Sequence, residues 1–180
     1  MIGSVIIGAL VLATIIVYFR YFKDKEKTEN KIEFSALSRN LKSINLLSDL
    51  ELGEKIGGKV KEKIDSGALT NTFAIRLSYC FNYAGYEIQM NEYGTTVKGK
   101  DGKNYIYTEN NFATFLNYKY GEYRLTFKDK SKFDGKKGVI VFNKCVILSA
   151  ANHVDLFNGY GVEMKDYFEE CDEYILYQFD

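Results

Sequence analysis

The one histidine of the chain, His153, is the residue best suited to proton transfer. An imidazole exchanges protons near neutral pH, so it can activate a nucleophile. Asp155 follows two residues later, and alternate residues of a β-strand point to one face. We therefore predict a candidate site in which both side chains lie on the same side of a sheet. A pair of surface polar residues is the alternative interpretation.

A second candidate element is a helix that begins after Asn71 and Thr72, two residue types favoured at helix N-caps. The free N–H groups and the dipole at such a helix start would stabilise a thiolate, and a nearby imidazole would exchange its proton. A cysteine in the first turn would complete a cysteine–histidine site. The sequence has Phe73 there, and a phenyl ring cannot attack a carbonyl.

The three cysteines have no spacing typical of a metal site, so we predict neither a metal nor another cofactor. Cys80 lies seven residues after Phe73 on nearly the same helix face, about 10.5 Å further along the axis. We interpret it as a core residue. Cys145 follows an apolar strand and could approach the site. One disulfide between two of Cys80, Cys145 and Cys171 is compatible with the sequence, which does not indicate the pair.

The elements that would position this chemistry predict an α+β domain with an antiparallel sheet, because helices come first and strands later. Residues 34–50 have the apolar spacing of a helix with a break near Ser43, and Gly57-Gly58 indicates a tight turn or a close backbone approach. We expect further helices after residue 72, ending near residue 85, and over 111–120. A hairpin is expected at 95–107, and strands at 138–142, 153–157 and 174–179.

The N-terminal segment is predicted to be a membrane anchor. Residues 2–19 carry no charge, which is just enough length for a bilayer core, and Tyr, Phe and Lys follow. A buried helix or a cleaved signal peptide is the alternative. We expect a transmembrane anchor at 1–22, spanning with residues 2–22, a linker at 23–31 and one domain at 32–180. The lysines predict a single-pass protein with a cytoplasmic domain; a periplasmic or secreted domain is the alternative.

The balance of charge argues against nucleic-acid binding. Lys plus Arg and Asp plus Glu both number 24, and no basic stripe is present. We therefore predict no nucleic-acid partner.

Several linked motifs resemble one family. Residues 56–60 read Ile-Gly-Gly-Lys-Val, residues 71–78 read Asn-Thr-Phe-Ala-Ile-Arg-Leu-Ser, and residues 153–159 read His-Val-Asp-Leu-Phe-Asn-Gly. They resemble the family 4 amidase effectors of the bacterial type VI secretion system. Those read Gly-Gly-Lys-Val, then Asn-Thr-Cys-Ala-x-Arg-Leu/Met-Ser, then Gly-His-Ile/Val-Asp-Leu-Trp-Asn/Asp-Gly. The resemblance covers roughly residues 32–180.

This resemblance implies a papain-like cysteine peptidase or amidase fold, with N-terminal helices packed on an antiparallel sheet. It also implies hydrolysis of the γ-D-glutamyl–meso-diaminopimelate bond in peptidoglycan stem peptides, and inhibition by an immunity protein. By resemblance, His153 matches the general base, and Asp166 or, alternatively, Asp155 the acid of the triad. Phe73 takes the place of the cysteine nucleophile. Asn152 and Phe157 replace a glycine and a tryptophan.

We therefore expect an amidase homologue without activity that acts by binding a stem peptide or an immunity-type protein. One alternative is an active cell-wall amidase that uses Cys80 or Cys145. Another is a membrane-tethered interaction protein.

Overall fold

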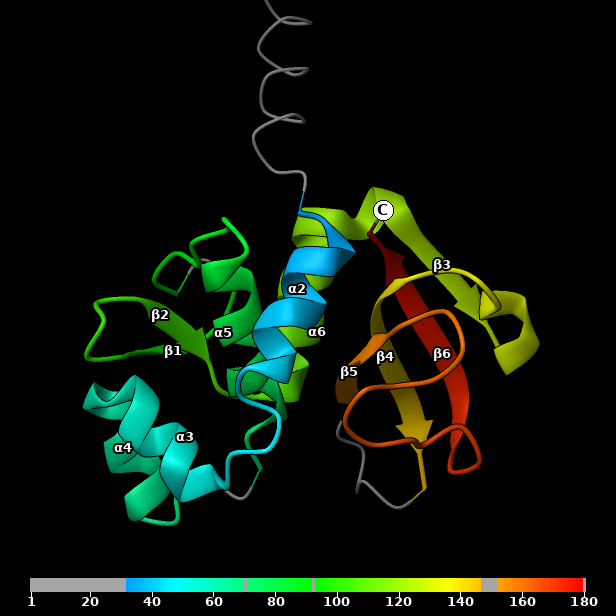
Figure 1. Cartoon of the computed structure of the whole chain (residues 1–180). Coiled ribbons are helices and arrows are strands. Elements are labelled where there is room, and N and C mark those ends of the chain that lie inside the picture. Colours follow the sequence, from blue (N-terminus) through cyan, green and yellow to red (C-terminus); the bar gives the residue numbers. More distant parts are fainter. Residues whose placement is uncertain (1–31, 70, 92, 147–151, 180) are drawn as a thin grey trace, which may run out of the picture. The chain divides into compact units, whose positions relative to one another are not determined.

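The computed structural model describes residues 32–69, 71–91, 93–146 and 152–179. Among the described residues four helices come first (Figure 1). They are α2 (Phe34–Lys42), α3 (Asp49–Ile56), α4 (Gly58–Asp65) and α5 (Phe73–Tyr83). The apolar spacing predicted the first and the last of them, whereas most of the second and all of the third were not predicted. The break expected near Ser43 is confirmed, because α2 ends there and Ser48 caps α3 through a capping box with Glu51.

The Gly57-Gly58 pair makes the turn between α3 and α4 and brings this corner against the hairpin. Both glycines have positive φ, 67° and 61°. A Cβ on Gly58 would lie 2.8 Å from the backbone of Gly99 and of Lys100. Only glycine fits such a conformation and such an approach, so the turn and the close approach predicted from the sequence are both confirmed.

The hairpin and one more helix follow. The hairpin pairs β1 (Thr96–Lys98) with β2 (Asn104–Ile106), as predicted. Helix α6 (Glu109–Tyr120) begins two residues earlier than expected, because Thr108 rather than a later residue caps it by accepting from the Asn111 N–H. This shift places Glu109 in the first turn of the helix.

The last third of the domain is a four-stranded antiparallel sheet, which confirms the α+β class. Its order is β3–β6–β4–β5. The strands are β3 (Arg124–Phe127), β4 (Gly138–Cys145), β5 (His153–Phe157) and β6 (Cys171–Gln178). Strand β3, an edge strand with alternating exposure, was not predicted. In the register of β4 and β5, Phe142 pairs with His153 and Ile140 with Asp155.

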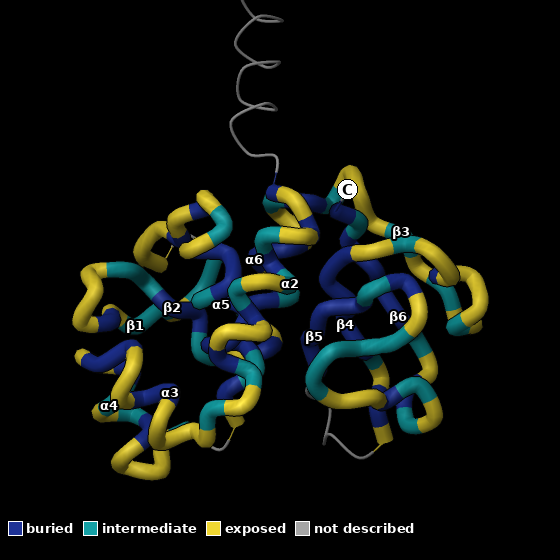
Figure 2. Tube along the Cα trace, viewed as in Figure 1, coloured by how far each residue is buried: buried dark blue, intermediate teal, exposed yellow. Residues whose placement is uncertain are grey.

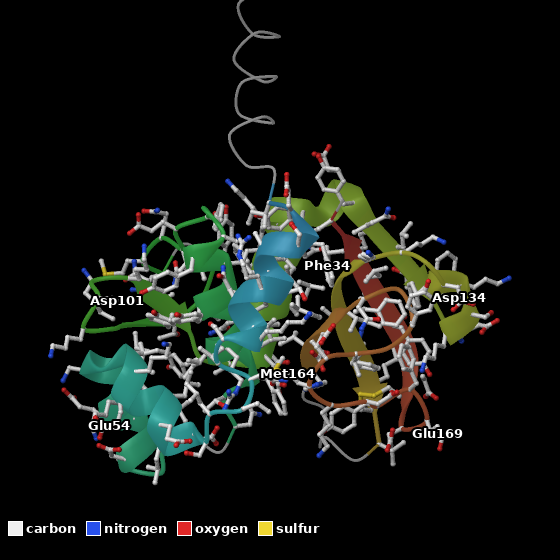
Figure 3. All side chains as sticks on the ribbon, viewed as in Figure 1. Phe34, Glu54, Asp101, Asp134, Met164 and Glu169 are labelled. Atoms are coloured by element: carbon white, nitrogen blue, oxygen red, sulfur yellow. A yellow bond between two sulfur atoms is a disulfide. The ribbon has the colours of Figure 1, made fainter. Side chains whose placement is uncertain are left out.

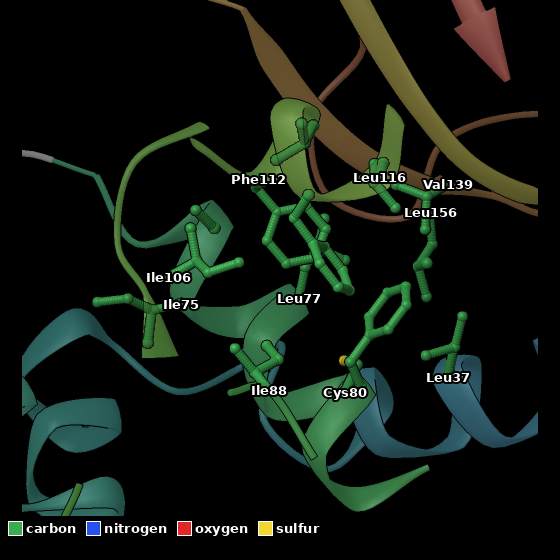
Figure 4. Packing of buried hydrophobic residues seen from close by; sticks show 14 of the residues in the cluster. Leu37, Ile75, Leu77, Cys80, Ile88, Ile106, Phe112, Leu116, Val139 and Leu156 are labelled. Atoms are coloured by element: carbon green, nitrogen blue, oxygen red, sulfur yellow. The ribbon is translucent and has the colours of Figure 1, made fainter. Parts of the chain in front are cut away.

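Strands β4 and β5 are buried on both faces, as the apolar run at 138–142 predicts (Figure 2). On one face, Val139 and Leu156 pack against the helices, where Leu37, Cys80, Phe112 and Leu116 complete the core (Figure 4). On the other face, a second cluster gathers around Phe133, Ile140, Phe142, Phe157 and Leu176. Helices α5 and α6 both contact β5, so the first turns of the two helices can meet the start of that strand.

One disulfide joins neighbouring strands. Cys145 at the end of β4 bonds Cys171 at the start of β6, and the bond is drawn in yellow in Figure 3. The sequence left the pairing open. Cys80 is free and buried on α5, as predicted for a core residue.

The prediction of a single-pass membrane protein with a cytoplasmic domain is contradicted. In the part of the chain that the structure describes, no helix is both long and apolar enough to cross a membrane. The longest helix there, α6, has 12 residues, whereas a bilayer core needs about 20. The predicted anchor at residues 2–22 and linker at 23–31 lie outside the described residues.

Candidate active site

The start of α5 is held by a buried arginine. The Arg76 guanidinium donates to the Ile44 and Leu47 carbonyls at 2.6 and 2.8 Å, and to Asp49 at 3.2 Å. Its Nε donates to the Thr72 hydroxyl, which in turn donates to Asp49. The helix begins after Thr72 as predicted, but no side-chain cap bond forms, because this hydroxyl serves the Arg76 network instead. These contacts fix the first turn of α5 and the direction of Phe73.

His153 begins β5 and lies against that first turn. The ring centroids of Phe73 and His153 are 4.5 Å apart in an edge-to-face arrangement. The structure therefore brings together the two positions that the sequence analysis singled out. A phenyl ring on this side gives the imidazole an apolar neighbour and no group that can be deprotonated to a nucleophile.

Two more aromatic rings surround the imidazole. Tyr167 lies 4.6 Å and Phe142 5.7 Å from it, centroid to centroid. His153 is 1% exposed as a result. A substrate could reach this ring only if one of the surrounding side chains moved.

A carboxylate from another element completes the surroundings of His153. Oε1 of Glu109, in the first turn of α6, lies 2.7 Å from Nδ1 of His153. The other oxygen, Oε2, accepts from the Asn71 side chain at 3.2 Å. Among the described residues Nε2 has no hydrogen-bond partner.

Asp155 lies on the same face as His153, with its Oδ2 3.9 Å from Nε2. It is fully buried, and its oxygens accept the backbone N–H groups of Leu156, Met164 and Lys165. Its hydrogen bonds therefore serve mainly to hold the segment after β5 against the strand.

Asp166 lies in that segment and points elsewhere. Its side chain is 53% exposed, pairs with Lys130 at 3.5 Å and accepts from the Phe168 N–H. No hydrogen bond or ion pair joins it to His153 in the described chain. The structure thus brings Phe73, His153 and Asp155 together, and not Asp166.

The charge state of the imidazole follows from these neighbours. Burial lowers the pKa of His153, but the carboxylates of Asp155 and Glu109 raise it by more, and the net pKa lies above the ordinary value. His153 is thereby biased toward the imidazolium form.

Neither Cys80 nor Cys145 offers a thiolate beside this ring. Burial raises the pKa of the Cys80 thiol far above its ordinary value, so the thiol stays protonated. Cys145 forms a disulfide with Cys171 and therefore has no free thiol. Within the described ranges no group of three or more His, Cys, Asp or Glu residues could hold a metal ion.

The sequence analysis missed Glu109. It lies 44 residues before His153. An acidic residue in the first turn of a helix is common, because the helix dipole stabilises a negative charge there. No local signal in the sequence links it to the histidine. Only the packing of α6 against β5 reveals the contact.

Comparisons with known proteins agree with this architecture. One similar structure is the complex of the effector Tae4 with the immunity protein Tai4 from Enterobacter cloacae. The matched chain is 28% identical to this protein in sequence, with a TM-score of 0.76 over 83% of this chain and 99% of that one. Tae4 in the Salmonella Typhimurium effector–immunity complex is 29% identical, with a TM-score of 0.77 over 84% of this chain and all of that one. A comparison with curated protein sequences finds no match.

The sequence profile described as "Type VI secretion system (T6SS), amidase effector protein 4" matches residues 69–177. That range runs from just before α5 to β6 and includes Phe73, Glu109 and His153. The chain therefore belongs to the family of type VI secretion system amidase effector 4 proteins.

Proposed function

We propose that this protein is a catalytically silent homologue of the peptidoglycan amidase effectors, with a papain-like fold, and that it acts by binding. The family chemistry would be hydrolysis of the γ-D-glutamyl–meso-diaminopimelate bond in stem peptides. The observation that carries the proposal is the Phe73 ring, packed edge-on against His153 where an active site would need a thiolate. Without a nucleophile, an amidase retains only the small rate that comes from binding and orientation.

The other cysteines argue against the alternative of an active amidase. Cys80 is 0% exposed and carries a thiol that burial keeps protonated, and Cys145 has no free thiol while its disulfide is intact. A nucleophile must reach hydrogen-bond distance of its base. Either cysteine would need a rebuilt site.

An immunity-type protein is the partner that the relatives favour. The E. cloacae and S. Typhimurium Tae4 proteins were both crystallised with Tai4. A peptidoglycan stem peptide is the second partner we propose. Isothermal titration calorimetry with a Tai4 protein and with a diaminopimelate-containing stem peptide separates the two. Binding of neither would overturn a role in binding these partners.

Restoring the thiol is the sharpest test of silence. We expect the full-length wild-type protein to leave purified muropeptides uncut, and Phe73→Cys to release the diaminopimelate-containing product. Phe73→Ala is the matched control, because it opens the same space without a thiol and should stay inactive. Phe73→Cys with His153→Ala should also be inactive.

Two outcomes would count against the proposal. Cleavage by the wild-type protein would refute silence. A folded but inert Phe73→Cys protein, with an unchanged circular dichroism spectrum, would show that the site lacks more than its nucleophile, so that Phe73 alone would not explain the silence.

A further inference from the structure

The carboxylate of Glu109 joins three elements that meet at the candidate active site. Its Oε1 is hydrogen bonded to His153 at the start of β5, and its Oε2 accepts from Asn71, just ahead of α5. Glu109 itself lies in the first turn of α6, where the helix dipole favours a negative charge. The side chain is 7% exposed, so its contacts with these two partners are largely shielded from water.

We propose that Glu109 is the positioning residue of His153: its carboxylate receives the Nδ1 proton, fixes the tautomer and the ring orientation, and leaves Nε2 as the one nitrogen free to act as a base. This inference deepens the proposed function by identifying the acid that orients His153. It rests on the proposed function only in treating His153 as the base of an amidase-type site. An ionised carboxylate has no proton to donate, so the hydrogen in this bond belongs to the imidazole. The same arrangement orients the histidine of Ser–His–Asp hydrolases.

Geometry favours Glu109 over the two aspartates. The Glu109–His153 distance is 2.7 Å, whereas Asp155 is 3.9 Å from the ring and is held by three backbone N–H groups. Asp166 is half-exposed and pairs with Lys130. Among these three acids, only Glu109 is within hydrogen-bond distance of an imidazole nitrogen.

A second bond between the same elements supports this role. The Asn110 side chain accepts from the backbone N–H of Asn152, at 3.1 Å, so α6 also holds the residue that precedes His153. The backbone N–H of the residue before the histidine and the histidine ring are thus both hydrogen bonded to the first turn of α6. Glu109 can therefore fix an orientation rather than follow the ring as it moves.

The groups around His153 define what a titration will report. Glu109 faces it from α6, Asp155 from β5 and Tyr167 from the segment between β5 and β6, with Lys165 over the Tyr167 ring. The neighbours from α5 and β4, Phe73 and Phe142, do not titrate. Removing the Glu109 charge leaves one carboxylate and the burial cost, so the pKa of His153 should fall.

NMR of the full-length protein tests the proposal directly, because one histidine yields one set of imidazole signals. Above the titration midpoint, long-range 15N–1H spectra of the wild type should show the proton on Nδ1. Glu109→Gln keeps a hydrogen-bond acceptor and removes the charge, so the midpoint should move to lower pH. Glu109→Ala should also remove the preference for a proton on Nδ1, so that both tautomers are populated. Asp166→Asn is the matched control and should change neither.

Each contrary result is informative. A wild-type imidazole protonated on Nε2 overturns the proposal without any variant. So does a folded Glu109→Gln protein with the wild-type midpoint, or a shift of equal size in Asp166→Asn. Peptide cleavage by the wild type would overturn the proposed silence and leave the role of Glu109 standing, so the two failures can be told apart.

Discussion

The first turn of α5 carries two residues with different roles, Arg76, which makes hydrogen bonds, and Phe73, which makes an aromatic contact. Arg76 is buried and donates to four acceptors, which include two backbone carbonyls of the turn after α2. Phe73, three residues earlier, makes an aromatic contact with His153 at the proposed nucleophile position. The hydrogen bonds that shape the helix start are complete, whereas the position that would carry chemistry is apolar. Folding and reactivity thus depend on different side chains of one turn, and either can be changed while the other is kept.

The largest effect on stability should come from removing Arg76, the residue of this turn that supports folding. Arg76→Ala removes four buried or part-buried hydrogen bonds, to the Ile44 and Leu47 carbonyls, the Thr72 hydroxyl and Asp49, and leaves the Ile44 carbonyl with the Leu47 N–H alone. We therefore expect a loss of about 3–5 kcal/mol in the free energy of unfolding. Urea denaturation followed by circular dichroism measures it. Arg39→Ala, an exposed arginine of α2, is the control and should cost about 0.5 kcal/mol or less. Equal losses in the two variants would contradict the account.

Removing the disulfide should have the next largest effect, and it tests the sheet that carries His153. The two cysteines are 26 residues apart, and the loop-entropy relation then predicts a loss of about 3.5 kcal/mol for the double variant Cys145→Ser/Cys171→Ser. Thermal and urea unfolding of the oxidised wild type and the double variant give the value. If the unreduced wild type, unfolded in urea so that buried Cys80 is accessible, reacts with a thiol reagent at three cysteines rather than one, the disulfide itself is refuted.

Changing the aromatic contact should cost less. Phe73→Leu keeps an apolar side chain and loses the edge-to-face packing on His153, for which about 1 kcal/mol is expected. Urea unfolding beside the Arg76→Ala variant shows whether the two positions of the turn differ as argued. A loss at Phe73 as large as that at Arg76 would make Phe73 the main structural anchor of the turn and would remove the contrast.

The smallest effect is a pH dependence of stability. The folded pKa of His153 is raised above its ordinary value of 6.5, so its contribution to stability is fully present below that pH. It is lost as the pH rises through the folded pKa. Urea unfolding between pH 6 and pH 8.5 should therefore show a gradual loss of stability in the wild type and a smaller one in Glu109→Gln. A wild-type stability that rises over this range would reverse the sign and contradict it.

The sequence predicted the framework of the site because its signals are local. The helix after Thr72, strand 153–157, the glycine turn and the α+β class each follow from neighbouring residues, and the structure confirms them. The use of the Thr72 hydroxyl was not predictable, because its partners lie in distant segments.

Contacts between distant elements were beyond the reach of sequence patterns. Glu109 resembles any acid at a helix start, and three cysteines allow three pairings. Asp166 was favoured by resemblance alone, and the structure pairs it with Lys130. Strand β3 was missed because, as an exposed edge strand, it has too weak an apolar pattern to stand out.

The most direct test of the central claim is a muropeptide digestion with the full-length wild-type protein and a His153→Ala variant, analysed by mass spectrometry. The account predicts that neither protein releases a diaminopimelate-containing fragment, because the imidazole has a phenyl ring rather than a thiolate beside it. Cleavage by the wild type that disappears in His153→Ala would contradict it.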